Sequence, residues 1–126
     1  MKKKHSGKQR GYSLMEVLVV LGIIGLVLAV AIPSFVAALG YAQKVTTQME
    51  LASITAALEM YRGEKQKYPA RLEELVAEKL LPAGGVMDSY NRPYVYQCTA
   101  NGTDYKLHST GKDGVDGNDD DIAAAR

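Results

Sequence analysis

The fold of this chain is decided by the stretch Arg10-Gly11-Tyr12-Ser13-Leu14-Met15-Glu16-Val17, which begins an apolar segment that continues to Leu39. From Val17 to Leu39 there is no charged side chain, and Ser34 supplies the only hydroxyl. A helix rises ~1.5 Å per residue, so this segment is about 35 Å long and can cross a hydrocarbon core of ~30 Å. The sequence therefore predicts a transmembrane helix with one acid, Glu16, at its N-terminal edge.

The apolar segment has three interpretations. It could be a plain single-pass anchor, or a secretory signal peptide cut after Ala29-Val30-Ala31. The signal peptide is disfavoured because the apolar run continues past that cut, Pro33 follows it closely and Glu16 interrupts the start of the run. In the third interpretation the cut lies between Gly11 and Tyr12, so the mature chain keeps its hydrophobic helix.

The sequence from Gly11 to Gly25 resembles the leader junction of type IV pilins and of the pseudopilins of type II secretion. In that family a prepilin peptidase cuts after the glycine and methylates the new N-terminus. The resemblance therefore implies cleavage after Gly11 and methylation of Tyr12, where the family usually has Phe. It also implies an assembly role for Glu16, the fifth mature residue, and it matches Pro33 to the family's helix-breaking proline.

The assembly role of Glu16 has a physical basis that is independent of the resemblance. Cleavage would create a cationic amine at Tyr12. An unpaired carboxylate and an unpaired amine are each costly to bury in an apolar bundle. Pairing Glu16 of one subunit with the amine of its neighbour relieves both costs and fixes the axial register of a helical homopolymer. A Glu16 that stays solvated at the membrane interface is the alternative.

Three helix breakers lie in the apolar segment: Gly22, Gly25 and Pro33. A proline inside a helix costs ~3 kcal/mol or more. The resemblance implies that the helix melts between Gly25 and Pro33 when the subunit leaves the bilayer and enters the filament. In the isolated subunit we expect only a kink at Pro33.

The charges are distributed unevenly along the chain. Of the 15 basic residues, five lie in residues 1–11, so the remaining chain has 10 basic residues against 14 acidic ones. A net negative mature chain argues against nucleic-acid binding. The basic leader marks the cytoplasmic flank. With the resemblance, this predicts a single-pass protein of the bacterial inner membrane with its C-terminus in the periplasm, which then enters a periplasmic or surface filament.

We predict three segments: a cleaved leader at 1–11, a transmembrane and assembly helix at 12–39, and a periplasmic globular domain at 40–126. A helix is predicted from Tyr41 to Arg62, ended by Gly63, as a continuation of the membrane helix. It has two apolar stripes, one formed by Val45, Met49, Ala52 and Ala56 and the other by Leu51, Ile54, Leu58 and Tyr61. One stripe should face the chain's own sheet, and part of the other could face neighbouring stems.

The sequence of the rest of the domain predicts a short helix and a small sheet. The helix is expected at 71–79, and two strands at 94–99 and 104–109 flank Asn101-Gly102. Alternate tyrosines on the strands predict sheet packing. The predicted fold class is therefore α+β, with a long N-terminal helix packed on a small antiparallel sheet. The segment Asp88-Ser89-Tyr90-Asn91-Arg92-Pro93-Tyr94 is similar to Asp-Pro-Trp-Gly-Asn-Pro-Tyr of the major pseudopilin.

For two single residues of the predicted sheet, the sequence predicts whether the side chain is buried or exposed. Cys98 is the only cysteine, so it can form no internal disulfide and is expected to be a small buried hydrophobe. His108 has no obvious partner at ligand spacing in the sequence, and we expect it on the solvent side of its strand.

The C-terminal motif places five aspartates and one asparagine within nine residues, interleaved with glycine, in residues 113–121. Unpaired, these carboxylates repel one another. A hard dication with ~6–8 oxygen ligands would turn that repulsion into a folded loop. The motif is not an EF-hand, because the position-12 residue counted from Asp113 is Ala124.

This motif resembles the C-terminal calcium loop of major pseudopilins, whose pattern is Ser-x-Gly-x-Asp-Gly followed by Asp-x-Asp-Ile. The resemblance implies a Ca²⁺ ion held by Asp113 and Asp119, with Asp121 as a third side-chain candidate. The choice among the last three aspartates stays open because this loop is shorter than the usual pattern. Further candidates are backbone carbonyls, those of Thr110, Val115 and Asn118. The alternative is a solvated acidic tail.

Two filament functions and two functions of other classes follow. The first is a major pseudopilin of a type II secretion system, a structural subunit that supports protein export. The resemblance implies as partners the prepilin peptidase, an inner-membrane assembly platform and minor pseudopilins. The second is a major type IV pilin for adhesion, twitching or DNA uptake. The third is a membrane-anchored calcium or glycan module, which leaves the leader motif unexplained. The fourth is an enzyme, for which the sequence holds no Ser/His/Asp set, metal-hydrolase His pair or phosphate loop.

Overall fold

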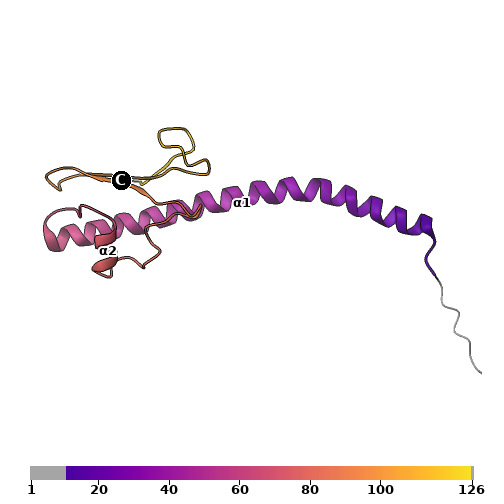
Figure 1. Ribbon diagram of the computed structural model, residues 1–126, viewed down its shortest axis with the longest axis horizontal. Coiled ribbons are helices and arrows are strands. Elements are labelled where there is room, and N and C mark those ends of the chain that lie inside the picture. Colours follow the sequence, from indigo (N-terminus) through magenta and orange to yellow (C-terminus); the bar gives the residue numbers. More distant parts are fainter. Residues whose placement is uncertain (1–10, 126) are drawn as a thin grey trace, which may run out of the picture. The chain divides into compact units, whose positions relative to one another are not determined.

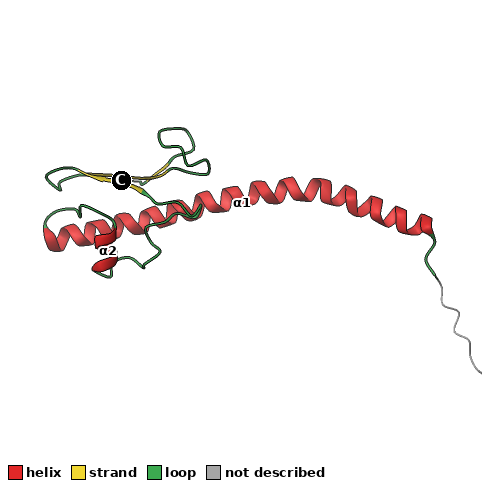
Figure 2. Ribbon diagram, in the orientation of Figure 1, coloured by secondary structure: helices red, strands yellow, loops and turns green. Residues whose placement is uncertain are grey.

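The computed structural model describes residues 11–125, so most of the predicted leader, residues 1–10, lies outside the described part. Its elements follow the order α1 (Leu14–Lys65), α2 (Glu73–Ala77), β1 (Val95–Cys98), β2 (Tyr105–Ser109) and β3 (Ile122–Ala123) (Figures 1 and 2). This confirms the α+β class, with a long N-terminal helix and a small antiparallel sheet. The chain divides into two compact units, residues 1–38 and residues 39–126.

Helix α1 begins directly after a polar cap. The Ser13 hydroxyl oxygen accepts a hydrogen bond from the backbone N–H of Glu16 at 3.2 Å, which satisfies one of the free donors of the first turn. The Glu16 carboxylate also lies at the positive end of the helix dipole. The helix continues as one element past Gly25 and Pro33, as predicted.

The prediction that Gly63 ends α1 is wrong. The helix continues to Lys65, and the chain turns at Gln66, which has a φ of 61° and donates its N–H to the Arg62 carbonyl at 2.8 Å. One glycine costs a helix only ~1 kcal/mol relative to alanine. That cost does not stop a helix whose next two residues, Glu64 and Lys65, both favour helix.

The N-terminal part of α1 has its apolar side chains on the outside. Among residues 11–125, α1 is the one helix that is long and apolar enough to cross a membrane. None of its most apolar 18-residue window is buried by the rest of the chain. Leu14 is 78% exposed, Leu26 71% and Val30 67%. Such a surface is stable only in lipid or against other protein.

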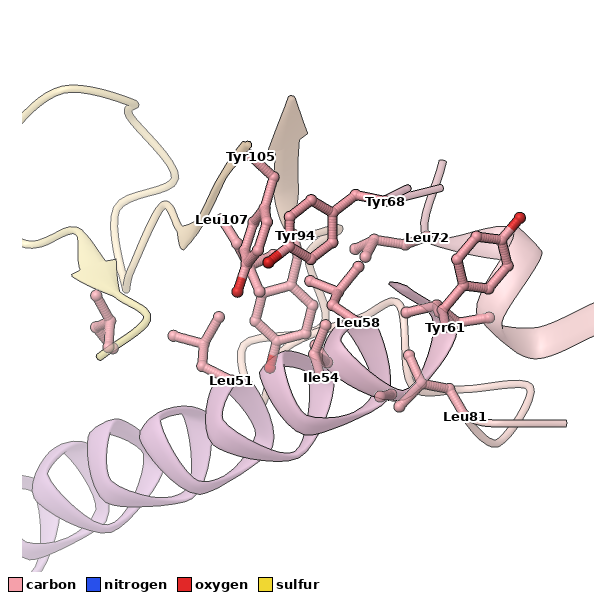
Figure 3. Close-up of a cluster of buried hydrophobic side chains, with 13 residues drawn as sticks. Leu51, Ile54, Leu58, Tyr61, Tyr68, Leu72, Leu81, Tyr94, Tyr105 and Leu107 are labelled. Carbon is pink, nitrogen blue, oxygen red and sulfur yellow. The ribbon is translucent and has the colours of Figure 1, made fainter. Parts of the chain in front are cut away.

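The second unit has its own hydrophobic core, to which α1 contributes one of the two predicted stripes. Leu51, Ile54 and Leu58 are almost completely buried, and they point toward Tyr94, Tyr105 and Leu107 of the sheet region (Figure 3). Burial of each such leucine or isoleucine contributes ~1.5–3 kcal/mol. The other stripe is mostly exposed, and Met49 is 69% exposed. The prediction that one stripe faces the chain's own sheet is therefore confirmed.

The sheet has the order β1-β2-β3, and both pairs are antiparallel. Strands β1 and β2 match the two predicted strands to within about one residue at each end, with Tyr96 opposite Leu107 and Cys98 opposite Tyr105. The two-residue strand β3 was not predicted, and it pairs Ile122 with Ser109.

Helix α2 is shorter than predicted because Lys79, with a φ of 60°, cannot continue it.

The alternate tyrosines of the strands pack the sheet, as predicted. Of this set, Tyr96 donates its hydroxyl to the Pro69 carbonyl at 2.7 Å. Tyr94 and two further core tyrosines, Tyr68 and Tyr61, donate to acids of the helices. Tyr94 donates to Glu50 at 2.8 Å, Tyr68 donates to Glu59 at 2.6 Å, and Tyr61 donates to Glu74 at 2.8 Å. Burial, followed by the bond to Glu50, raises the pKa of Tyr94 well above its usual value. Cys98 is half-buried against this core rather than fully buried.

Candidate functional site

The predicted processing site lies just outside the helix. Gly11, Tyr12 and Ser13 are not helical, and the Tyr12 side chain is 82% exposed. A peptidase must draw an extended backbone into its active site, so a bond in this segment is accessible without unwinding α1. The geometry is therefore compatible with cleavage between Gly11 and Tyr12.

Glu16 lies in the first turn of α1, shortly after the non-helical Tyr12, within the exposed apolar surface. It borders a shallow hollow on α1 whose other residues are Tyr12, Val17, Val20 and Leu21. A carboxylate beside exposed apolar side chains is costly once those side chains are covered, unless a cation comes with the covering surface. Gly25 and Pro33, the predicted boundaries of helix melting, are both helical in this chain.

The second candidate site, the loop between β2 and β3, is anchored at its start by a buried carboxylate. Asp88, only 5% exposed, accepts hydrogen bonds from the N–H groups of Tyr90 and Arg92 and from the Ser109 hydroxyl. The Ser109 hydroxyl oxygen in turn accepts the Gly111 N–H at 3.1 Å. The segment that begins at Asp88 therefore holds the entrance of the aspartate loop in place.

Within the loop, the carboxylates bond to the loop's own backbone. Asp113 accepts the N–H of Val115 at 2.9 Å and the side-chain amide of Asn118 at 2.7 Å. Asp120 accepts the N–H of Asp113 at 3.0 Å. Gly111, Gly114 and Gly117 all have positive φ, which lets the backbone turn toward these oxygens. The loop is thus a folded structure and not an extended acidic tail.

The structure brings together some of the predicted calcium ligands and not others. Asp113 contacts the side-chain amide of Asn118, not its predicted carbonyl, and the structure describes no such contact for Asp119; both aspartates are exposed. Two predicted backbone ligands accept bonds inside the loop: the Thr110 carbonyl from Gly114 and the Asn118 carbonyl from Asp121.

The donor chemistry of the loop nevertheless suits a hard cation. Its carboxylates, amide and carbonyls supply only oxygen ligands, which calcium prefers. One of them, Oδ1 of Asp121, is buried and has no hydrogen-bond partner among residues 11–125. An unpaired buried carboxylate oxygen is costly, and a cation would satisfy it.

Sequence reasoning missed a cluster on the other side of the loop. His108, expected to face solvent without a partner, has its Nε2 2.6 Å from Oδ1 of Asp116. His108, Asp116 and Asp121 each offer one ligand atom, and these atoms lie within 4.8 Å of one another. Asp113 and Asp119 are not in this group. The spacing of these residues in the sequence does not indicate the cluster. His108 and Asp121 come together only through the pairing of β2 with β3.

Comparison with known proteins decides between the candidate functions. Residues 34–125 match the family described as type II secretion system (T2SS) protein G, and residues 6–32 match the prokaryotic N-terminal methylation motif. The chain belongs to the T2SS protein G family. This is the family of the major pseudopilins, which the resemblance in the sequence had indicated.

Individual relatives of protein G match over nearly the whole chain. The type II secretion system core protein G of Escherichia coli K12 is 32% identical, with 91% of this chain and 90% of the relative covered. That of Pseudomonas aeruginosa is 27% identical, with 92% of each chain covered. That of Klebsiella michiganensis is 29% identical, with 90% and 91% covered. No solved structure matches the chain significantly.

Membership of the protein G family fixes the class of function. The chain is a structural pseudopilin, a filament subunit of a secretion system, and not an enzyme. Its apolar N-terminal helix and its family indicate membrane anchoring. The comparisons favour the pseudopilin over the type IV pilin of a surface fibre.

The glycine at the entrance of the loop gives a test of the loop's geometry. A Cβ at Gly111 would overlap the backbone carbonyl of Asp120, and its φ of 64° is itself unfavourable for alanine. We expect Gly111→Ala to destabilise the second unit by several kcal/mol and to lower its melting temperature by 10 °C or more. Gly63→Ala is the matched control: it lies in α1 with open space around it, and should be neutral or slightly stabilising. Equal melting temperatures for the two variants would contradict this description of the loop.

Proposed function

We propose that this pseudopilin is the body subunit of a short periplasmic filament, and that it polymerises through the N-terminal part of α1 after its leader is removed. The observation that supports this best is the uncovered apolar surface of α1 with a single carboxylate, Glu16, near its start. A membrane stores such a surface before assembly, and neighbouring subunits can cover it afterwards.

Processing is the first step of this proposal. The prepilin peptidase removes residues 1–11 and methylates the amine of Tyr12. The new amine then lies just before α1, whose first turn carries Glu16 of the same chain. Because one subunit offers both a cation and an anion at the same end, a stagger along the filament axis lets each copy pair its Glu16 with the amine of the next.

Orientation and partners follow from the position of the charges. The basic leader keeps the N-terminus in the cytoplasm, so residues 40–126 lie in the periplasm. An inner-membrane assembly platform adds subunits at the base of the filament, and minor pseudopilins act with it. Melting of α1 between Gly25 and Pro33 accompanies the transfer from lipid to filament, because a proline leaves backbone groups without intrahelical partners there.

Calcium is the proposed cofactor of the loop between β2 and β3. Asp113 and Asp119, with Asp121 as a third side chain, would hold the ion together with carbonyl groups of the loop. The ion would neutralise the mutual repulsion of carboxylates that lie close together. With one cysteine in the chain, it would serve as the clasp that a disulfide provides elsewhere.

The N-terminus of the mature protein tests the processing step. We expect mass spectrometry of the membrane fraction to find a chain that begins at Tyr12 with a methyl group on its amine. A Gly11→Val substitution should leave the leader attached, because the peptidase requires a small residue at the cut. A mature chain that begins at Met1 or at Ile32 would contradict the proposal.

Calcium binding can be tested on the metal-free full-length chain in detergent. At a calcium concentration about 100-fold above Kd, binding adds ~2.7 kcal/mol to the free energy of unfolding. We therefore expect CaCl₂ to raise the melting temperature of the second unit by about 10 °C. Asp113→Asn should remove this shift, and Glu64→Gln, which changes an exposed acid on α1, should keep it. An unchanged melting temperature in CaCl₂ would contradict calcium binding by the loop.

A further inference from the structure

We propose that His108, Asp116 and Asp121 form a second cation site, selective for a borderline divalent ion such as Zn²⁺ over Ca²⁺. The three ligand atoms lie within 4.8 Å of one another. They line one hollow of about 410 Å³ at the edge of the sheet, between β2 and the returning loop. This site shares Asp121 with the calcium site proposed above, and the imidazole nitrogen of His108 distinguishes its ligand set from that all-oxygen one.

One of the three residues lies on β2 and the other two lie on the loop between β2 and β3, and the backbone fixes the position of two of them. His108 lies on β2, where it is paired with Ala123 of β3. Asp121 directly precedes β3, so the same strand pairing brings it to the edge beside His108. Asp116 comes from the far turn of the loop and is 58% exposed, so it can adjust its position.

Asp121 is oriented as a metal ligand would be. Its Oδ2 accepts the N–H of Gly117 at 2.7 Å, which fixes the carboxylate plane. Its Oδ1 is buried, without a hydrogen-bond partner among the described residues, and Asp121 is one of the residues that line the hollow with His108 and Asp116. Hydrogen bonds that backbone N–H groups donate to one carboxylate oxygen are a common way to orient the other oxygen toward an ion.

The distances allow an ion with small adjustments. Zinc bonds to imidazole nitrogen and carboxylate oxygen are about 2.0–2.2 Å long, so two ligands of a tetrahedral ion lie about 3.4 Å apart. Nε2 of His108 and Oδ1 of Asp116 are 2.6 Å apart in direct contact. They need to separate by less than about 1 Å for an ion to enter, and the exposed Asp116 side chain can supply that movement.

The ligand set determines which ion is preferred. Imidazole nitrogen suits zinc, copper and nickel, whereas calcium and magnesium prefer oxygen ligands. One histidine and two carboxylates leave a fourth position of a tetrahedral zinc ion for water. Lys106 also borders the hollow, and its ammonium would repel a bound cation and so weaken its binding.

Isothermal titration of the metal-free full-length chain in detergent with ZnCl₂ tests this site. We expect one zinc ion per chain, and a loss of affinity of at least 10-fold in His108→Gln. The same variant should bind calcium as the wild type does. Asp113→Asn should have the opposite pattern, with calcium binding weakened and zinc binding retained, so that failure of one site is distinguishable from failure of the other. Lys106→Met should bind zinc more tightly than the wild type.

Chemical protection of the histidine gives a second measurement that does not depend on stability. The chain has two histidines, and the other one, His5, lies in the leader. In the processed chain diethyl pyrocarbonate therefore has one imidazole to modify. Zinc should slow modification of His108 at least 10-fold, and calcium should not. Equal zinc affinity in wild type and His108→Gln, or equal modification rates with and without zinc, would overturn the proposal.

Discussion

The structure depends on how unevenly the apolar side chains of one helix are covered. The 52-residue α1 has a C-terminal part whose apolar stripe is covered by the chain's own sheet, and an N-terminal part whose apolar side chains are left uncovered. Among the described residues, the core contains no side chain of α1 before Leu51. A chain of this kind must be held in lipid or polymerise, and membership of the T2SS protein G family is in agreement with this constraint.

At the folded end, a few buried polar residues connect the helix, the sheet and the aspartate loop. The Ser89 hydroxyl donates to the Gln43 carbonyl at 3.0 Å and contacts the hydroxyl of Thr47, which is fully buried on α1. The neighbouring Asp88 bonds to Ser109 at the end of β2, where the loop begins. Buried polar groups fully satisfied in this way favour one arrangement over its competitors. These hydrogen bonds connect the start of the aspartate loop to the helix that carries the core stripe.

Much of the fold could be predicted because its signals are local. The 3.6-residue period predicted α1 and its core stripe of Leu51, Ile54 and Leu58, and the alternating tyrosines predicted β1 and β2. The end of α1 was placed too early because one glycine is a weak stop signal. The two-residue strand β3 has no periodicity to detect. The contact of His108 with Asp116 depends on the β2–β3 register and on the path of the loop, neither of which sequence spacing reveals.

In the proposed polymer, Glu16 of one copy pairs with the amine of the next. The most direct measurement compares filament yield in cells that express wild type, Glu16→Ala, or Glu64→Ala as a control for loss of an exposed acid on the same helix. We expect Glu16→Ala to be processed and to accumulate in the membrane at the normal level, yet to form few filaments, while Glu64→Ala forms them normally. Filaments at normal yield from Glu16→Ala would contradict the account.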